Sequence, residues 1–235
     1  MDRPLTALVT GGAHGIGAAI AARLVRDGWH VVVADVDPAG TAPRGGRYVV
    51  CDVADEAAVA GLLAGVAAQE GRLSALVCNA GISRNKPIAQ LSLAEWSRVI
   101  AVNLTSTFLL ARAAETMLRA SHGAIITVAS TRAHMSEPHT EAYSATKGGL
   151  VALTHALAIS LAPQVRVNCI SPGWIFTKGD APRTGDQAFH PAGRVGTPDD
   201  IAALAAFLLG PESGFITGAE FVVDGGVMRK MIYPE

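Results

Sequence analysis

The stretch that decides the fold is LTALVTGGAHGIGAAIAARLVRD, residues 5–27. Leu5 to Val9 is an aliphatic run of the kind that forms a buried strand, and Ala18 to Asp27 has a helical pattern. Between them lies TGGAHGIG, residues 10–17, with glycines spaced Gly-x-x-x-Gly-x-Gly. Glycines permit a tight turn and let backbone N–H groups approach a pyrophosphate, whose charge a helix N-terminus stabilises. The sequence therefore predicts a strand, a phosphate-binding turn and a helix, as at the start of a dinucleotide-binding fold.

The alternation of strand and helix continues along the chain. Further strands are predicted at residues 30–34, 48–51, 73–78, 123–129, 165–170 and 221–223, and further helices at 55–69, 92–120, 141–162 and 198–209. Strands that alternate with helices form a parallel sheet covered on both faces. We therefore predict an α/β fold: a doubly wound parallel sheet of about seven strands with helices on both faces, the Rossmann fold.

Two segments break this alternation. Residues 37–47 are rich in Pro and Gly and too few for a good crossover helix. Residues 174–192 show no clear periodicity, and Gly and Pro break any long helix there, so we expect a short substrate lid. No linker composition appears, so residues 1–235 are expected to form a single dinucleotide-binding and catalytic domain.

Composition narrows the possible partners and location. The formal net charge is −1, with no run of like charge, which argues against nucleic acid and acidic membranes as partners. No apolar run is long enough for a membrane span, and the N-terminal run is too short for a signal peptide. Cys51, Cys78 and Cys169 lie in or beside apolar runs, as free thiols do in the cytoplasm. His134 and His139 have no third ligand nearby, so no metal site is expected.

A carboxylate follows the second predicted strand. Asp35 lies 18 residues beyond Gly17, close to the offset at which an acidic residue binds the ribose hydroxyls of NAD. Its charge would repel the 2′-phosphate of NADP. The alternative is that Asp35 only caps a turn with Asp37 and Pro38. The position at a strand end favours the interpretation as an NAD site.

The stretch YSATK, residues 143–147, carries the candidate chemistry. In a helix over 141–162, Tyr143 and Lys147 lie four residues apart on one face. An ammonium beside a phenol favours the phenolate, so the pKa of Tyr143 is predicted to fall from about 10. The nearby helix N-terminus acts in the same direction. We therefore predict that Tyr143 is a general acid/base.

Other polar groups occupy positions that suit a site. Asn79-Ala80-Gly81 and Ser130 each follow a predicted strand, and strand carboxyl ends face the ligand crevice in open α/β sheets. Asn103 lies within the predicted long helix among apolar neighbours, where an Asn needs either a hydrogen-bonding role or solvent.

Together these motifs resemble the short-chain dehydrogenase/reductase family over nearly the whole chain. TGGAHGIG resembles the family's cofactor turn, and GRVGTPDDIA at 193–202 with VDGG at 223–226 resembles its C-terminal pattern. The family's four catalytic residues are matched by Asn103, Ser130, Tyr143 and Lys147. The resemblance implies cofactor contacts at Gly11, His14, Gly15, Ile16, Gly17, Asp35, Asp52, Val53, Asn79, Ala80, Gly81, Tyr143, Lys147, Pro172, Gly173, Ile175 and Thr177.

The resemblance also implies a mechanism, hydride transfer between a nicotinamide and a carbinol or carbonyl carbon. Tyr143 would be the general acid/base, and Lys147 would lower its pKa and bind the nicotinamide ribose. Ser130 would hold and polarise the substrate oxygen. Asn103 would anchor a water that links Lys147 to solvent as a proton relay.

Three functions fit these residues. An NAD-dependent dehydrogenase acting on a secondary alcohol, such as a sugar, polyol or cyclic alcohol, is favoured by Asp35. The alternative is an NADPH-dependent 3-oxoacyl thioester or carbonyl reductase, which resembles the chain across the same motifs. A non-catalytic nucleotide-binding regulator on the same scaffold is disfavoured, because all four catalytic identities are present.

The sequence also suggests which residues face the substrate and how the subunits assemble. Arg132 and Trp174 are the candidate substrate-facing groups; Arg132 would recognise a carboxylate or a polyol, or would be a solvated loop residue. The family commonly pairs the helices around 103–120 and 143–161 across a tetramer interface. A homotetramer is therefore expected, with the tail 228–233 reaching across a subunit boundary. Small residues on the second helix would permit close packing, either there or only within the subunit.

Overall fold

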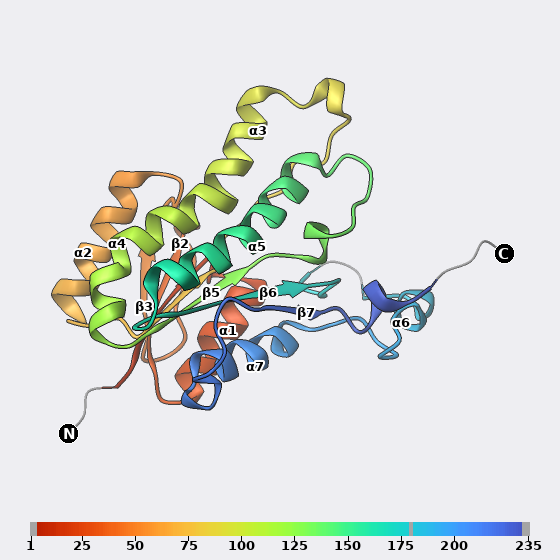
Figure 1. Cartoon of the computed structure of the whole chain (residues 1–235). Coiled ribbons are helices and arrows are strands. Elements are labelled where there is room, and N and C mark those ends of the chain that lie inside the picture. Colours follow the sequence, from red (N-terminus) through yellow and green to blue (C-terminus); the bar gives the residue numbers. More distant parts are fainter. Residues whose placement is uncertain (1–3, 179–180, 232–235) are drawn as a thin grey trace.

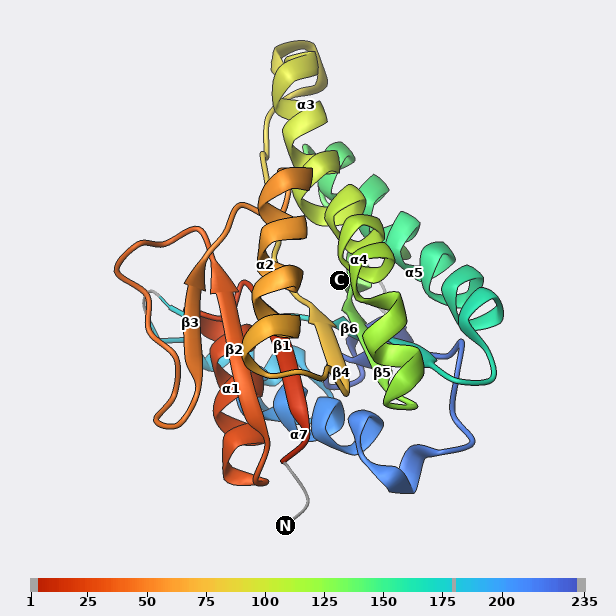
Figure 2. The same cartoon turned by 90° about the vertical axis from the view of Figure 1, so that its left-hand side faces the viewer.

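One parallel sheet organises the computed structural model, which describes residues 4–178 and 181–231. In this described part of the chain the sheet has seven strands, β1 (Thr6–Thr10), β2 (His30–Asp35), β3 (Arg47–Val50), β4 (Ala75–Cys78), β5 (Ala124–Val128), β6 (Arg166–Pro172) and β7 (Glu220–Val223). Their order is β3-β2-β1-β4-β5-β6-β7, and each neighbouring pair is parallel. Figure 2 shows β3 at one edge with β2 and β1 following it. The predicted doubly wound sheet is confirmed.

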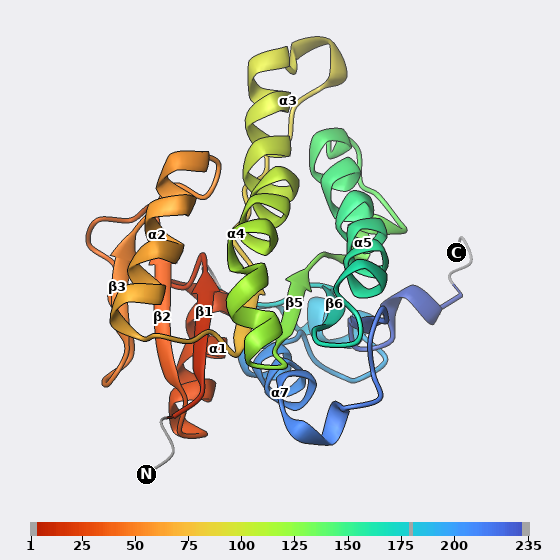
Figure 3. The ribbon, with the colours of Figure 1, turned by 60° about the vertical axis from the view of Figure 1, so that its left-hand side comes forward.

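Helices cover both faces of this sheet, as Figure 1 shows. On one face α1 (Gly15–Arg26) packs against α7 (Pro198–Leu209); the other face carries α2 (Glu56–Gln69), α4 (Ser106–Ala120) and α5 (Glu141–Leu161). Figure 3 shows α3 (Leu93–Ile100) extending the line of α4 beyond the sheet. The short α6 (Thr184–Phe189) lies near the segment that follows β7 (Figure 1).

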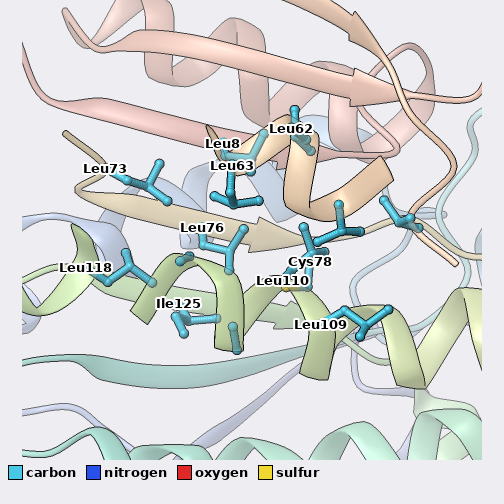
Figure 4. Close-up of a cluster of buried hydrophobic side chains, with 14 of the residues drawn as sticks. Leu8, Leu62, Leu63, Leu73, Leu76, Cys78, Leu109, Leu110, Leu118 and Ile125 are labelled. Atoms are coloured by element: carbon cyan, nitrogen blue, oxygen red, sulfur yellow. The ribbon is translucent and has the colours of Figure 1, made fainter. Parts of the chain in front are cut away.

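Strand side chains alternate between two cores. On β1, Leu8 points into the core under α2 and α4, whereas Ala7 and Val9 point into the core under α1 and α7. Figure 4 shows Leu8 close to Leu63 of α2 and Leu76 of β4. Each such buried leucine contributes roughly 1.5–3 kcal/mol through removal of apolar surface from water. Burial on both faces explains why the strands are apolar throughout rather than alternating.

Local signals decide where two of the helices begin, as predicted. The Asp55 carboxylate accepts hydrogen bonds from the N–H groups of Ala57 at 2.8 Å and Ala58 at 3.1 Å, which caps α2. Ser92 and Glu95 form a capping box at the start of α3.

The helix predicted over 92–120 is interrupted in its middle. Residues Ala101–Thr105 form a π-helical turn between α3 and α4, and the Ser106 N–H donates to the carbonyl of Ala101, five residues back. Such wider turns occur frequently at functional sites. Asn103 lies in this turn, which explains how a mediocre helix former is accommodated there.

The segment 174–192 contains a helix that periodicity did not predict. α6 begins where the Arg183 N–H donates to the Asp186 carboxylate at 2.8 Å. Six residues are too few to show an apolar period. Residues 179–180, which belong to the predicted lid, lie outside the described residues. By contrast, the connection between β2 and β3 is described throughout and holds no helix, as predicted.

The strand order fixes where a ligand can bind. From β1, the strands β2 and β3 follow one another towards one edge of the sheet. On the other side of β1, the strands β4 to β7 follow one another towards the opposite edge. The connections on either side of this β1/β4 boundary diverge, which leaves a crevice outside the carboxyl ends of the strands.

Candidate active site

A cleft of about 870 Å³ runs along the carboxyl ends of the central strands. It is within the size range of small-molecule and cofactor pockets. Its lining includes the predicted residues Gly11, His14, Gly15, Ile16, Asp35, Asp52, Val53, Asn79, Ala80, Gly81, Ser130, Arg132, Tyr143, Lys147, Pro172, Gly173, Ile175 and Thr177. Of the other predicted residues, Trp174 lines a second cavity, and Gly17 and Asn103 are not part of either lining.

The glycine turn after β1 has positions that favour glycine. Gly11 and Gly15 have φ angles of 62° and 55°, in the left-handed region. A Cβ on Gly17 would lie 2.2 Å from the Gly11 carbonyl oxygen, so Gly17 permits close packing of α1 on the turn. The helix begins at Gly15, earlier than predicted, with His14 as its N-cap. The N-terminus of α1 therefore faces the cleft, where its partial positive charge suits a pyrophosphate.

Main-chain donors hold Asp35 at the end of β2. Its Oδ2 accepts a hydrogen bond from the Ala13 N–H at 3.0 Å, and its Oδ1 accepts one from the Asp37 N–H at 3.2 Å. Asp35 therefore shapes its turn and also lines the cleft. Because an ionised carboxylate offers about four lone-pair positions, it can still accept hydrogen bonds from ribose hydroxyls.

Two basic side chains that could be considered for binding a 2′-phosphate are paired with acids. The Arg47 guanidinium donates to both carboxylate oxygens of Glu70, at 2.8 and 2.9 Å. His14 Nε2 lies 2.9 Å from Asp37 Oδ2, and this hydrogen bond lowers the pKa of Asp37. Arg47 also lies at the opposite end of β3 from Asp35, because it is aligned with Val32 whereas Asp35 is aligned with Val50.

The loop after β3 brings Asp52 and Val53 to the cleft. Asp52 accepts hydrogen bonds from the Ala54 N–H at 3.0 Å and from Arg98 Nη2 at 2.8 Å. Arg98 comes from α3 and lines the cleft, but sequence analysis did not single it out. An isolated Arg on a helix carries no local signal of a partner 46 residues away.

Asn79 joins the ends of β1 and β4. Its side-chain N–H₂ donates to the carbonyls of Thr10 at 3.0 Å and Gly11 at 2.9 Å. A Cβ on Gly11 would lie 2.7 Å from the Cα of Ala80. The Asn79–Gly81 turn thus packs directly on the glycine turn, and Ala80 and Gly81 line the cleft.

Asn103 makes three of the four hydrogen bonds that its side-chain amide can form. Its Oδ1 accepts from the Ile82 N–H at 2.8 Å, and its Nδ2 donates to the Ile82 carbonyl at 2.9 Å and to Thr146 Oγ1 at 3.1 Å. A Cβ on Gly81 would lie 3.6 Å from Asn103 Oδ1 and 3.7 Å from Lys147 Nζ. Asn103 therefore fastens the end of the β4 loop beside Lys147.

Ser130 follows β5 with its hydroxyl on the cleft. The Oγ atom accepts a hydrogen bond from the Arg132 N–H at 3.2 Å. Its own O–H reaches the Pro172 carbonyl only at 3.5 Å, a weak contact. The hydroxyl proton is therefore available to a substrate oxygen.

Lys147 and Tyr143 are close neighbours in the site, but their electrostatics differ from the prediction. Lys147 Nζ lies 5.2 Å from the centre of the Tyr143 ring and donates to the Val128 carbonyl at 2.8 Å. Burial lowers the pKa of Lys147 to about 8. Burial also raises the pKa of Tyr143, although a hydrogen bond with the Ser130 side chain and the positive charge of Arg132 act to lower it. The predicted fall in the pKa of Tyr143 through Lys147 is wrong for this structure, because removal from water outweighs the neighbouring charges.

The segment after β6 closes the far end of the cleft. A Cβ on Gly173 would lie 2.6 Å from Asp224 Cβ, so glycine is needed for close approach to the β7 turn. Ile175 forms a parallel bridge with Gly196, which holds the strand-like segment in place. Thr177 lies opposite Gly15, where an added Cβ would be 3.2 Å from its methyl group.

A second cavity of about 490 Å³ opens beside Ser130. It shares Ser130, Arg132 and Gly173 with the main cleft and is also lined by Thr131, Met135, Glu137, Trp174, Phe189, His190, Asp224 and Val227. Both predicted substrate residues, Arg132 and Trp174, are part of this lining. Arg132 is not an unpaired loop residue, because its Nη2 forms an ion pair with Glu137 Oε1 at 2.6 Å.

The described residues contain neither a metal-binding cluster nor a membrane-spanning helix. Within residues 4–178 and 181–231, no group of three or more His, Cys, Asp or Glu side chains is placed to hold a metal ion. In the same part of the chain, no helix has the length and apolar character to cross a membrane.

Comparison with known proteins agrees with this geometry. The family model described as enoyl-(acyl carrier protein) reductase matches residues 11–228. An uncharacterized oxidoreductase of Thermotoga maritima is 47% identical over 250 residues, covering 97% of this chain and 98% of the relative. The chain belongs to the short-chain dehydrogenase/reductase family. A further relative in this family, the D-threitol dehydrogenase of Mycolicibacterium smegmatis, is 41% identical, covering 95% of this chain and 93% of the relative.

Solved structures extend the likeness to the whole fold of this short-chain dehydrogenase/reductase. The apo SCOR enzyme from Clostridium thermocellum has a TM-score of 0.92 at 39% identity, covering 99% of this chain and 96% of that one. The 3-ketoacyl-(acyl-carrier-protein) reductase from Brucella melitensis, complexed with NADH, has a TM-score of 0.88 at 33% identity, covering 95% and 98%. Family membership makes the chain an oxidoreductase with a nicotinamide dinucleotide site.

Proposed function

We propose that this oxidoreductase transfers a hydride between NAD(H) and a secondary alcohol or its ketone. The observation that carries the proposal is the Asp35 carboxylate, held on the cleft by the Ala13 N–H at 3.0 Å. A carboxylate at that position accepts hydrogen bonds from ribose hydroxyls and repels a 2′-phosphate. Arg47 offers no phosphate-binding cation beside Asp35, because it lies at the other end of β3 and pairs with Glu70.

The residues of the cleft fit a dinucleotide along its whole length. Gly15 and Ile16, at the N-terminus of α1, suit the pyrophosphate, and Asp35 suits the adenosine ribose. At the other end, Lys147 and Gly173 would hold the nicotinamide ribose and its ring. The bound nicotinamide supplies or accepts the hydride.

The chain's own residues would move and hold the proton. The Tyr143 hydroxyl, beside Ser130, would take the proton from the substrate hydroxyl during oxidation and return it during reduction. The Ser130 O–H would donate to the same substrate oxygen and polarise it. Lys147 uses one of its three donors on the Val128 carbonyl and keeps two for a ribose and for a proton path. Asn103, which faces Gly81 beside Lys147, would anchor the relay water.

The reductase alternative rests on the likeness to the Brucella melitensis enzyme named above. That likeness supports activity on 3-oxoacyl thioesters, whereas preference for NADPH is the expectation from the sequence for such a reductase. A regulatory protein without activity is a weaker fit, because Ser130, Tyr143 and Lys147 all line one cleft.

We also propose that the chain forms one domain, is located in the cytoplasm and assembles as a homotetramer. The cysteines of the described chain are free and buried, which supports a reducing compartment. Phe108 of α4 and Ile159 of α5 are exposed apolar side chains that a subunit interface would cover. Gly149 packs on Leu104 within the subunit, so not every small residue of α5 is available to a partner. Residues 232–233 of the proposed bridging tail lie outside the described residues, and a monomer in light scattering would refute the tetramer.

Cofactor titration tests the proposal first. The purified protein is titrated with NAD, NADH, NADP and NADPH, followed by fluorescence, and is then assayed for oxidation of secondary alcohols and reduction of ketones. We expect NAD(H) to bind at least about tenfold more tightly than NADP(H), which corresponds to about 1.4 kcal/mol. Preference for NADP(H), or no turnover of any alcohol or ketone, would refute the proposed function.

A further inference from the structure

The second cavity is placed to receive the part of a substrate that does not react. It meets the main cleft at Ser130, Arg132 and Gly173. A substrate oxygen at Ser130 and Tyr143 would direct the rest of the molecule into this cavity. Its described walls come from three separate parts of the chain: the segment from Thr131 to Glu137, the residues Trp174, Phe189 and His190, and the turn after β7.

The ionic groups of the cavity leave it rich in hydrogen-bond acceptors. Among the described residues of its lining, Arg132 is the one guanidinium, and its pairing with Glu137 at 2.6 Å offsets its charge. Asp224 adds a second carboxylate, which accepts hydrogen bonds from the N–H groups of Gly226 at 2.8 Å and Met228 at 2.7 Å. Among the described residues of the lining, the formal charges of two carboxylates and one guanidinium sum to −1. An anionic substrate would be repelled, whereas hydroxyl groups would find acceptors.

His190 adds an acceptor whose orientation is set by the fold. The side chain is 3% exposed, and its Nδ1 lies 2.8 Å from the carbonyl oxygen of Asp186. Since a carbonyl oxygen only accepts, Nδ1 must carry the hydrogen, and in the neutral ring Nε2 is then an acceptor. No side chain or main-chain group of residues 4–178 and 181–231 bonds to this Nε2.

Packing holds this imidazole in place. Its ring centre lies 6.0 Å from that of Trp174 and 5.9 Å from that of Phe189. The next turn is fixed to the segment after β7, because the Ala192 N–H donates to the Gly225 carbonyl at 3.0 Å. Figure 1 shows α6 and the segment after β7 at the same end of the molecule. The acceptor is therefore held on the wall of the cavity rather than on a loose loop.

We propose that the second cavity selects a neutral substrate with more than one hydroxyl group, and that His190 Nε2 accepts a hydrogen bond from a hydroxyl that does not react. The proposal rests on the proposed function, because the reacting carbinol must lie at Ser130 and Tyr143. On oxidation the carbinol carbon loses a hydride to NAD⁺ and its oxygen loses a proton to Tyr143, which leaves a hydroxyketone. Met135, Trp174, Phe189 and Val227 provide apolar surface for the carbon skeleton.

Matched substrates test this selection in the wild-type enzyme. The set is 2-butanol as the monool, 2,3-butanediol as the diol, a tetritol and 3-hydroxybutanoate. Each is assayed with NAD⁺ at the same pH. We expect kcat/KM for the diol and the tetritol to exceed that for the monool by at least about tenfold, the effect of one well-made hydrogen bond. The hydroxy acid should be the poorest substrate.

Two variants test the role of His190. In His190→Asn the side-chain amide can still donate to Asp186 but no longer reaches the position of Nε2, so the ratio of diol to monool kcat/KM should fall by about tenfold. In His190→Gln the amide oxygen can occupy the distal position, and most of that ratio should remain. Circular dichroism and the Tm of each variant establish whether it is folded.

The outcomes separate this proposal from the proposed function. If the monool and diol are oxidised equally well, or the hydroxy acid is preferred, the selection is refuted while the dehydrogenase function stands. If His190→Asn keeps the wild-type ratio, the role of His190 is refuted. If no alcohol or corresponding ketone reacts with NAD(H) or NADP(H), the proposed function itself fails.

Discussion

Replacement of Lys147 by Met should change how stability depends on pH. Lys147 is 4% exposed, and burial lowers its pKa from an ordinary 10.5 to about 8. At about 1.4 kcal/mol for each pH unit of difference, holding the ammonium in the folded protein costs about 3 kcal/mol at neutral pH. Methionine fills a similar volume and carries no charge, so the Lys147→Met protein does not have this cost.

The sign follows from where protons bind. Between pH 8 and pH 10.5 the lysine is charged in the unfolded chain but increasingly neutral in the folded protein. Because the unfolded state then binds more protons, the stability of the wild type rises with pH across this window. Below pH 8 both states are charged, and the contribution is constant. Other groups titrate in this range too, but they are common to both proteins and cancel in the difference.

Urea unfolding, followed by tryptophan fluorescence at several pH values from 7 to about 10.5, measures this difference. We expect the free energy of unfolding of the wild type, minus that of Lys147→Met, to rise by about 3 kcal/mol across the window. The loss of the hydrogen bond to the Val128 carbonyl shifts the variant's stability at every pH and leaves the slope unchanged. Lys178→Met, which removes an exposed lysine, is the matched control for replacing a lysine by methionine. A flat difference for Lys147→Met would refute the argument that burial depresses its pKa.

Three further predictions test the site and its frame. Tyr143→Phe should lower turnover by at least about a hundredfold while NAD still binds; near-normal turnover would remove Tyr143 as the acid/base. Asp35→Ser should reduce the preference for NAD over NADP by at least about tenfold; an unchanged preference in cofactor titrations would contradict the ribose assignment. Gly17→Ala should destabilise the protein by roughly 1–3 kcal/mol, because the new Cβ would lie 2.2 Å from a main-chain oxygen. Gly61→Ala on α2, with nothing within 4 Å of its Cβ, should instead stabilise it by about 0.5–1 kcal/mol, and equal Tm shifts for the two would refute this packing argument.

The sequence alone predicted the fold, and all of its candidate catalytic and cofactor residues except Gly17 and Asn103 line the main cleft. Strand and helix periodicity is a local property of consecutive side chains, so it predicted the alternating elements and the parallel sheet. The glycine turn was predictable because positive φ angles at Gly11 and Gly15 favour one residue type. Asp35 was found by its distance from that turn, and Tyr143 and Lys147 by their spacing on a helix.

Only the tertiary structure determined the pKa shifts of the site residues and their hydrogen-bond partners. The direction of the Tyr143 pKa depends on how much water the packed chain removes, which residue spacing does not report. The partners of Arg98 and Asn103 come from distant segments, with no local trace in the sequence. The second cavity and the orientation of His190 likewise arise where three separate segments meet. The local sequence therefore determined which catalytic side chains are present. Long-range packing determined the pKa shifts of Tyr143 and Lys147 and the shape of the second cavity.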